Sequence, residues 1–236
     1  MSIYAISDLH LSFDPRIRKP MDVFGTAWVD HADRVKAAWE AAVSPEDTVL
    51  VPGDLSWGLR LDEALADLEW IHRLPGRKIF VKGNHDLWWT SPSQVNALHE
   101  DMIFLQNHAA FAEGAWICGT RGWVCPGTDE FSEHDERIYR RELIRLRFSL
   151  EEARQAGAED IIAMLHYPPT NDRFQPSGFT DLLTEFGVRT CVYGHLHGQD
   201  NFRRGLRGEY GGVDYHLVSL DAVGAQPVKI RPIEDE

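Results

Sequence analysis

Eight polar residues with metal-binding or acid–base side chains follow short apolar runs in this sequence. They are two aspartates, one asparagine and five histidines: Asp8, His10, Asp54, Asn84, His85, His166, His195 and His197. Short apolar runs bounded by turn residues predict buried strands. Open α/β sheets bind ligands at the carboxyl ends of their strands, so we expect these side chains to meet at one edge of the fold.

This combination of side chains points to metal chemistry. Two carboxylates, an amide oxygen and several imidazoles are costly to bring together, because desolvated carboxylates repel each other and buried imidazoles need partners. Divalent cations supply the compensating charge. The set mixes oxygen and nitrogen donors and contains no thiolate. It therefore favours two borderline transition metals such as Mn, Fe or Zn over Ca or Mg.

The first hundred residues alternate between strand and helix patterns. Apolar residues at helical spacing predict a helix over residues 32–43, with Asp30 as a candidate cap, and a second helix over residues 61–71. Each helix leads into a predicted strand, at residues 48–51 and 78–81. Repeated strand–helix–strand units favour parallel pairing of their strands.

The second half of the chain predicts a different arrangement. Residues 102–105 and 116–118 are expected to be short strands of an antiparallel second sheet. Residues 132–155 predict one long charged helix that ends at Gly157. Its alternating Arg and Glu residues are typical of a solvated, ion-paired helix face, and the other interpretation is that the segment at about 131–157 caps the active site. Further strands are expected at residues 161–165, 189–193, 215–219 and 228–230.

Length and composition limit the class of protein. The chain has 236 residues, 43% of them hydrophobic, which suits one domain over residues 1–236 with a continuous core. A formal charge of −13 disfavours nucleic acid and anionic membranes as partners. The three cysteines form no Cys-x-x-Cys pair, and no apolar run is long enough to span a bilayer. We therefore expect a cytoplasmic protein; the oligomeric state is left open.

The chain resembles the calcineurin-like metallophosphoesterase superfamily. The resemblance rests on five blocks in the family's order: Asp8-Leu9-His10, Gly53-Asp54, Gly83-Asn84-His85-Asp86, His166, and Gly194-His195-Leu196-His197. No block falls between about residues 100 and 160. The resemblance implies a mixed α/β (α+β) fold in which two mixed β-sheets form a sandwich flanked by helices.

The resemblance also implies a role for each block. One metal ion would be bound by Asp8, His10 and His197, and the other by Asn84, His166 and His195. Asp54 would bridge the two ions. A hydroxide shared between two metals about 3.5–4 Å apart would attack phosphorus in line. His85 would stabilise the phosphoryl group or protonate the leaving oxygen, and Asp86 is expected either to orient that imidazole or to serve as a plain cap.

Two departures from the family's patterns narrow the substrate class. Protein phosphatases of this superfamily have Val-Asp-Arg-Gly after Gly-Asp and Glu after Gly-Asn-His, whereas this chain has Leu55-Ser56-Trp57-Gly58 and Asp86. Lipid A precursor hydrolases have Arg where this chain has His85. The resemblance therefore implies a hydrolase of small phosphate esters. A phosphodiesterase acting on a nucleotide-like ester is preferred over a phosphomonoesterase, and the alternatives from other classes are a non-catalytic interaction scaffold and a nuclease.

Two further features have competing interpretations. Arg121, within Gly119-Thr120-Arg121-Gly122-Trp123, is a candidate for binding a substrate phosphate bidentately, or else a solvated turn residue. Several aromatic residues near the motifs could form a wall for a nucleobase or aryl group, but core and lid packing is the favoured interpretation. They are Trp57, Trp88, Trp89, Trp123 and Tyr167.

Overall fold

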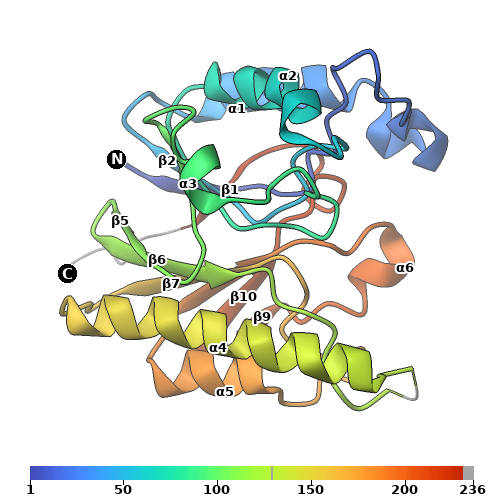
Figure 1. The fold of residues 1–236 in the computed structure, drawn as a ribbon. Coiled ribbons are helices and arrows are strands. Elements are labelled where there is room, and N and C mark those ends of the chain that lie inside the picture. The colour runs from blue at the N-terminus through green and yellow to red at the C-terminus, as the bar shows by residue number, and fades with distance from the viewer. Residues whose placement is uncertain (129, 231–236) are drawn as a thin grey trace.

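A computed structural model describes residues 1–128 and 130–230, and two mixed β-sheets face each other in it between layers of helices (Figure 1). The expected domain, 1–236, includes residues 129 and 231–236, which lie outside the described residues. The first sheet has the order β11 (Val228–Ile230), β1 (Ile3–Ala5), β2 (Thr48–Val51), β3 (Arg77–Phe80) and β4 (Met102–Phe104). The second has the order β5 (Ala110–Ala112), β6 (Ala115–Thr120), β7 (Ile161–Leu165), β8 (Thr190–Tyr193), β10 (Val213–Leu217) and β9 (Gly208–Tyr210). The predicted sandwich of two mixed sheets is confirmed.

Helices cover the outer face of each sheet (Figure 1). The first sheet carries α1 (His31–Ala42) and α2 (Leu61–His72), and the second carries α4 (Glu133–Gln155) and α5 (Gly178–Glu185). Shorter elements complete the set: the 3₁₀ turns η1 (Met21–Phe24) and η2 (Thr26–Trp28), and the helices α3 (Pro92–Val95) and α6 (Gln199–Phe202). None of the helices in the described ranges is both long and apolar enough to cross a membrane.

The core has three layers because the central strands are buried on both faces. In β2, Val49 and Val51 face α1 and α2, while Leu50 faces the second sheet. Parallel strands covered on both sides are expected to be continuously apolar rather than alternating, and all four residues of β2 are buried. This burial explains why the strands that position the polar motifs could be recognised as short apolar runs.

Two expectations about local structure need correction, one in full and one in part. Residues 102–105 were expected in an antiparallel second sheet, but β4 pairs parallel with β3 in the first sheet. The short helix α3 makes the crossover, and Phe104 stacks on Phe80 with ring centroids 4.7 Å apart, which stabilises this pairing. Asp30, the candidate cap, does occupy the N-cap position of α1, but it lies in the left-handed region with φ 49° and its side chain makes no capping hydrogen bond.

The long helix α4 begins and ends close to its predicted limits. Ser132 caps it by accepting a hydrogen bond from the Asp135 backbone N–H. Its apolar face, including Leu146 and Leu150, packs on the second sheet. Near its start, the Trp123 indole donates to Asp135 at 3.0 Å. Most of α4 is therefore a layer of the sandwich, and only its first turns extend beyond the strand ends.

Candidate metal centre

Strands from both sheets bring the predicted ligands to one end of the sandwich. Asp8, Asp54 and Asn84 follow β1, β2 and β3, whereas His166 and His195 follow β7 and β8. Hydrogen bonds from backbone N–H groups join these loops: Asp8 donates to Gly53 O at 3.0 Å and Gly194 to His166 O at 3.2 Å. His195 N–H donates to the Asp8 carboxylate at 3.0 Å, and His85 N–H to that of Asp54 at 2.8 Å. The loops therefore form one connected surface rather than independent turns.

The ligand loops contain an unusual set of backbone conformations. Four ligand residues that are not glycine have positive φ: Asp8 (60°), His10 (46°), Asp54 (54°) and His195 (71°). Such conformations cost of the order of 1–3 kcal/mol each and persist only where surrounding structure enforces them. At Gly83, an added Cβ would collide with the carboxylate of Asp54, so glycine is required for the loops to approach.

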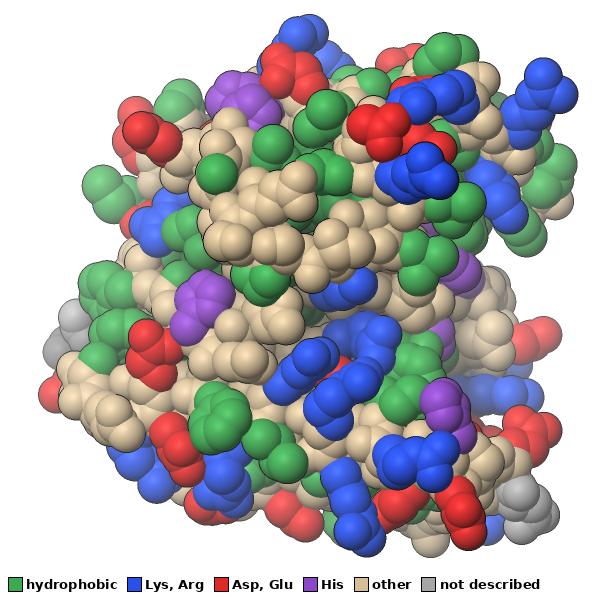
Figure 2. Space-filling view, viewed as in Figure 1, with side chains coloured by type: hydrophobic (Ala, Val, Ile, Leu, Met, Phe, Trp, Pro, Cys, Tyr) green, Lys and Arg blue, Asp and Glu red, His purple; other side chains and the backbone are tan. Residues whose placement is uncertain are grey.

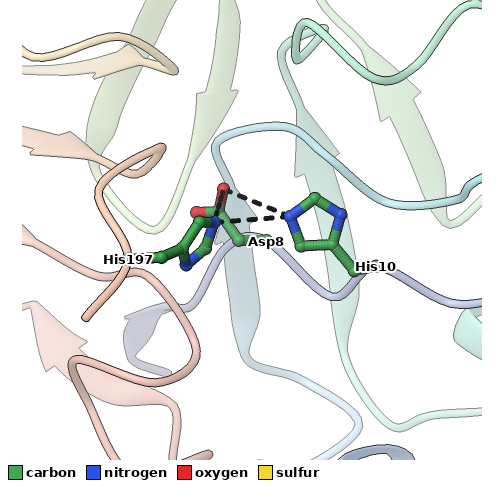
Figure 3. A group of neighbouring side chains, drawn as sticks. All are labelled: Asp8, His10 and His197. Atoms are coloured by element: carbon green, nitrogen blue, oxygen red, sulfur yellow. Dashed lines mark hydrogen bonds and ion pairs between the residues drawn. The ribbon is translucent and has the colours of Figure 1, made fainter. Parts of the chain in front are cut away.

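One group of ligands consists of Asp8, His10 and His197 (Figure 3). The His197 Nε2 lies 3.3 Å from Asp8 Oδ1 and 3.4 Å from the His10 Nε2. The Asp8 carboxylate and the two imidazoles point toward a shared point. Asp8 and His10 are buried, while His197 is partly exposed, so the group lies at the edge of a cleft.

A second group, whose members do not line that cleft, includes Asp54, Asn84, His166 and His195. The Asn84 Oδ1 lies 2.7 Å from His166 Nε2 and 2.9 Å from His195 Nδ1. The Asp54 Oδ2 lies 3.4 Å from His166 Nε2 and 3.8 Å from His10 Nε2. Asp54 therefore lies between the two groups, which is the position that a bridging carboxylate needs.

Neighbouring acceptors determine which imidazole nitrogen faces the centre. The His166 Nδ1 lies 3.0 Å from Pro52 O, so Nδ1–H donates there and the Nε2 lone pair faces Asn84 and Asp54. Burial lowers the pKa of His166 to about 4 and that of His195 to about 3. Both imidazoles are neutral near pH 7, which is the form that binds a metal ion.

The pKa values of Asp54 and Asp8 are shifted in opposite directions. Burial raises the pKa of Asp54 well above its usual range, and the nearby carboxylates of Asp86 and Asp8 add to this effect. Burial also acts to raise the pKa of Asp8, but the hydrogen bond and charge of His197 outweigh it and hold that pKa well below its usual range. A cation beside Asp54 would relieve the repulsion, so the donor set fits a metal centre.

Asp221 is a functional candidate that the sequence reasoning missed. Its Oδ1 lies 2.9 Å from the His197 Nδ1, which leaves Nε2 facing Asp8. Burial acts to lower the pKa of His197, but the hydrogen bonds to Asp221 and Asp8 outweigh it and raise that pKa to about 10. A carboxylate behind a ligating imidazole fixes its tautomer and orientation. The signal was available, because Asp221 follows the strand that was expected at residues 215–219.

Asp86 does not contact the His85 imidazole as one interpretation expected. Its carboxylate accepts hydrogen bonds from the backbone N–H groups of Gly83 (2.8 Å), Asp54 (2.9 Å) and Leu55 (2.8 Å). The buried Asp86 therefore ties the β2 loop to the β3 loop. The His85 ring instead packs beside Trp57, with centroids 4.3 Å apart.

A cleft of about 650 Å³ opens beside the ligand groups. His10, His85 and His197 form its polar side. The remaining wall is largely apolar and includes Met21, Phe24, Trp28, Trp57 and Phe202. The segment at residues 11–30 therefore passes near the ligand end of the sheet.

The aromatic residues near the motifs and Arg121 lie in different parts of the structure. Trp88 and Trp89 are buried in the core, where Trp89 packs edge-on against Phe104, so the packing interpretation is correct for them. Trp57 instead lines the cleft. The Arg121 side chain lies in a different cavity, bordered by α4, and none of the candidate ligands lines that cavity.

A third cluster, His72, His99 and Asp101, has groups close enough to hold a metal ion. The Lys78 ammonium, however, donates to Asp101 Oδ2 at 2.7 Å. A cation at this cluster would face that positive charge at short range, so the ion pair already satisfies the carboxylate.

Comparison with known proteins gives a family and a fold. A model of the calcineurin-like phosphoesterase family matches residues 1–199. The gene 66 protein of Mycobacterium phage L5 is 35% identical over 82 residues, which is 34% of this chain and 37% of the phage protein. The match therefore spans well under half of that relative's length.

Two solved structures are similar over most of the chain. Phosphopantetheinyl hydrolase from Mycobacterium tuberculosis is 18% identical, with a TM-score of 0.58 over 98% of this chain and 96% of the other. A Thermus thermophilus protein is 14% identical, with a TM-score of 0.54 over 84% of this chain and 82% of the other. At these identities the likeness shows a shared fold.

Proposed function

The chain belongs to the calcineurin-like phosphoesterase family, and from this premise we propose that it hydrolyses a small phosphate ester with two divalent metal ions. One observation carries the proposal: seven candidate ligand side chains, with Asp54 between their two groups, come together from the ends of five strands in two sheets. No single sheet or local motif could assemble this set. When bound, the metal ions would activate water and neutralise phosphoryl oxygens.

The assignment of ligands follows the two groups. Asp8, His10 and His197 would hold the ion at the cleft edge, and Asn84, His166 and His195 the other ion. Asp54 would contact both ions, since its carboxylate lies between the groups. Mn, Fe and Zn remain the expected metals, because the donors are imidazoles with carboxylate and amide oxygens.

His85 is the proposed acid–base residue. It lines the cleft beside His10 and is half-buried. Its backbone N–H donates to Asp54 Oδ1 at 2.8 Å, which holds the residue next to the proposed bridging carboxylate. The imidazole is therefore positioned to donate a hydrogen bond to a phosphoryl oxygen or a proton to the leaving oxygen.

The cleft supports an ester with an apolar or aromatic organic group. Trp28, Trp57 and Phe24 line it, and the Trp57 ring is stacked on His10 with centroids 4.7 Å apart. Aromatic walls of this kind bind a nucleobase or aryl group through stacking and apolar contact. A cleft of about 650 Å³ has room for an organic group on each side of the phosphate, which favours a diester over a monoester.

Other features support a cytoplasmic location and a capping position for the start of α4. The three cysteines are free and buried thiols, which suits the reducing conditions of the cytoplasm.

At the start of α4, Asp135 contacts Trp123, which packs on Tyr167 beside His195. This chain of contacts would let the first turns of α4 cover one side of the metal centre.

Hydrolysis assays on chelator-treated protein test the proposal. Bis(p-nitrophenyl) phosphate and p-nitrophenyl phosphate would be compared after adding back Mn²⁺, Fe²⁺ or Zn²⁺ separately. We expect metal-dependent turnover that is faster on the diester, with about two metal ions per chain. Faster turnover of the monoester would reverse the substrate preference. No turnover with any metal, in protein that binds two ions, would favour the scaffold interpretation.

A further inference from the structure

A second cavity, of about 330 Å³, lies between the ends of β3 and β6 and the middle of α4. Its lining includes four cationic side chains: Lys82, Arg121, Arg141 and Arg145. Glu142 is the one acidic residue among the described residues that line it. Figure 2 shows Lys and Arg side chains gathered over a hollow on this face, with an acidic side chain among them. The cavity is locally basic although the whole chain carries a formal charge of −13.

The buried Glu142 organises the arginines but cannot neutralise them. Its Oε1 lies 2.9 Å from Arg145 Nη1, 3.3 Å from Arg141 Nε and 3.6 Å from Arg121 Nη2. Its Oε2 accepts a hydrogen bond from the Thr120 hydroxyl at 2.6 Å. One carboxylate thus holds three guanidinium groups around the cavity and leaves most of their donors for another acceptor.

The Arg121 side chain is more buried and more closely packed than that of a solvated turn residue. Its side chain is only 18% exposed and its guanidinium lies 4.6 Å from the Trp123 ring centroid. Its buried Nε has no hydrogen-bond partner among the described residues. A buried guanidinium N–H without an acceptor costs free energy unless a bound group supplies one.

Lys82 completes the basic lining from the opposite side. Its ammonium donates to Trp89 O at 2.6 Å, which leaves two N–H groups for other acceptors. An anion in the cavity would offer acceptors to those N–H groups.

We propose that this cavity binds the phosphate group of a small molecule, at a site separate from the metal centre. Arginine guanidinium groups match the geometry of phosphate oxygens bidentately, and the three arginines converge with a lysine on one space. The cavity volume is at the small end for ligand sites, so it suits inorganic phosphate or a mononucleotide. No candidate metal ligand is among the described residues that line it.

Calorimetric titration of the full-length, manganese-treated chain carrying Asp54→Asn tests this site, since that change weakens binding of phosphate at the metal centre. Inorganic phosphate and adenosine 5′-monophosphate are the two probes. We expect saturable binding of both. Equal affinities would identify the phosphate alone as the ligand, whereas tighter binding of the nucleotide would identify a nucleotide site.

Two charge-matched variants in this background decide whether the cavity is responsible. Arg141→Gln with Arg145→Gln removes two cavity cations and should weaken binding by about tenfold or more. Arg137→Gln with Arg140→Gln removes two exposed cations from the same helix and should change affinity by less than about twofold. Equal effects of the two variants, or no saturable binding before substitution, would overturn the proposal.

Glu142→Gln provides a test with the opposite sign. The amide oxygen can still accept the Thr120 hydrogen bond, but the negative charge among the arginines is lost. Phosphate binding should then tighten by about threefold or more, because the cavity gains net positive charge. Unchanged or weaker binding, in a variant with an unaltered circular dichroism spectrum, would contradict the cavity as the phosphate site.

Discussion

The two cavities beside the strand ends have opposite chemistry. The metal centre and its cleft combine carboxylates and imidazoles, which are metal-binding groups, with aromatic walls. The cavity beside α4 combines donor groups around a single buried carboxylate. The first would therefore attract a cation and the second an anion. Under the proposed function, phosphoryl chemistry would depend on the metal ions and His85, whereas Arg121 lines the other cavity.

Of the substitutions that test this comparison, Asp54→Asn is expected to have the largest effect on activity. It removes the charge from the carboxylate that lies between the two ligand groups, so metal-dependent ester hydrolysis should fall to background. Metal content by mass spectrometry should fall below two ions per chain. Full activity with two bound ions would mean that the cluster at the first cavity is not the catalytic centre.

His85→Ala should have the next largest effect. Turnover should fall by about 10²–10⁴-fold, since a positioned proton donor contributes that much. Metal content should stay close to that of the unsubstituted chain, because the ring packs beside Trp57 and its backbone N–H, rather than its side chain, bonds to Asp54. Loss of metal would instead reclassify His85 as a ligand. Steady-state rates and metal analysis of the same preparation separate these outcomes.

Asp221→Asn should weaken metal binding by about 10–100-fold. The carboxylate holds the His197 ring, so its loss affects the ion at the cleft edge more than the other one. Competition with a chelator of known affinity measures the change. Asp214→Asn is a matched control, because Asp214 lies near the start of β10, at the opposite end from Asp221, and its carboxylate bonds to His216. Equal affinities of the Asp221→Asn and unsubstituted proteins would remove Asp221 from the site.

Phe24→Ala should have the smallest effect. This exposed ring lines the apolar side of the cleft, so its removal should raise KM for an aryl diester by about fivefold with little change in kcat. Phe148→Ala, at an exposed position on α4, is the control and should leave both parameters unchanged. A change in kcat alone at Phe24 would show that the wall acts on the chemical step rather than on binding.

Much of the fold could be predicted because its signals are local. Residues 49–51 of β2 and all of β7 are continuously apolar, as is expected for strands buried on both faces. The long helix α4 is marked by Ser132 and by its periodic apolar residues. The pairing of β4 could not be predicted in the same way, since a three-residue strand has too few side chains to identify its neighbour. Its contact between Phe104 and Phe80 is long-range.

The convergence of the candidate ligands could be predicted from the sequence, because each of them follows a strand whose apolar run is recognisable by itself. Parallel strands bring such ends together whatever the details of the loops. Only the tertiary structure decided what lies behind and beside those ligands. Asp86 ties backbone loops, Asp221 supports His197, and Arg121 faces Glu142 on α4. These roles depend on the direction of each side chain relative to segments distant in the sequence, and no local pattern records that direction.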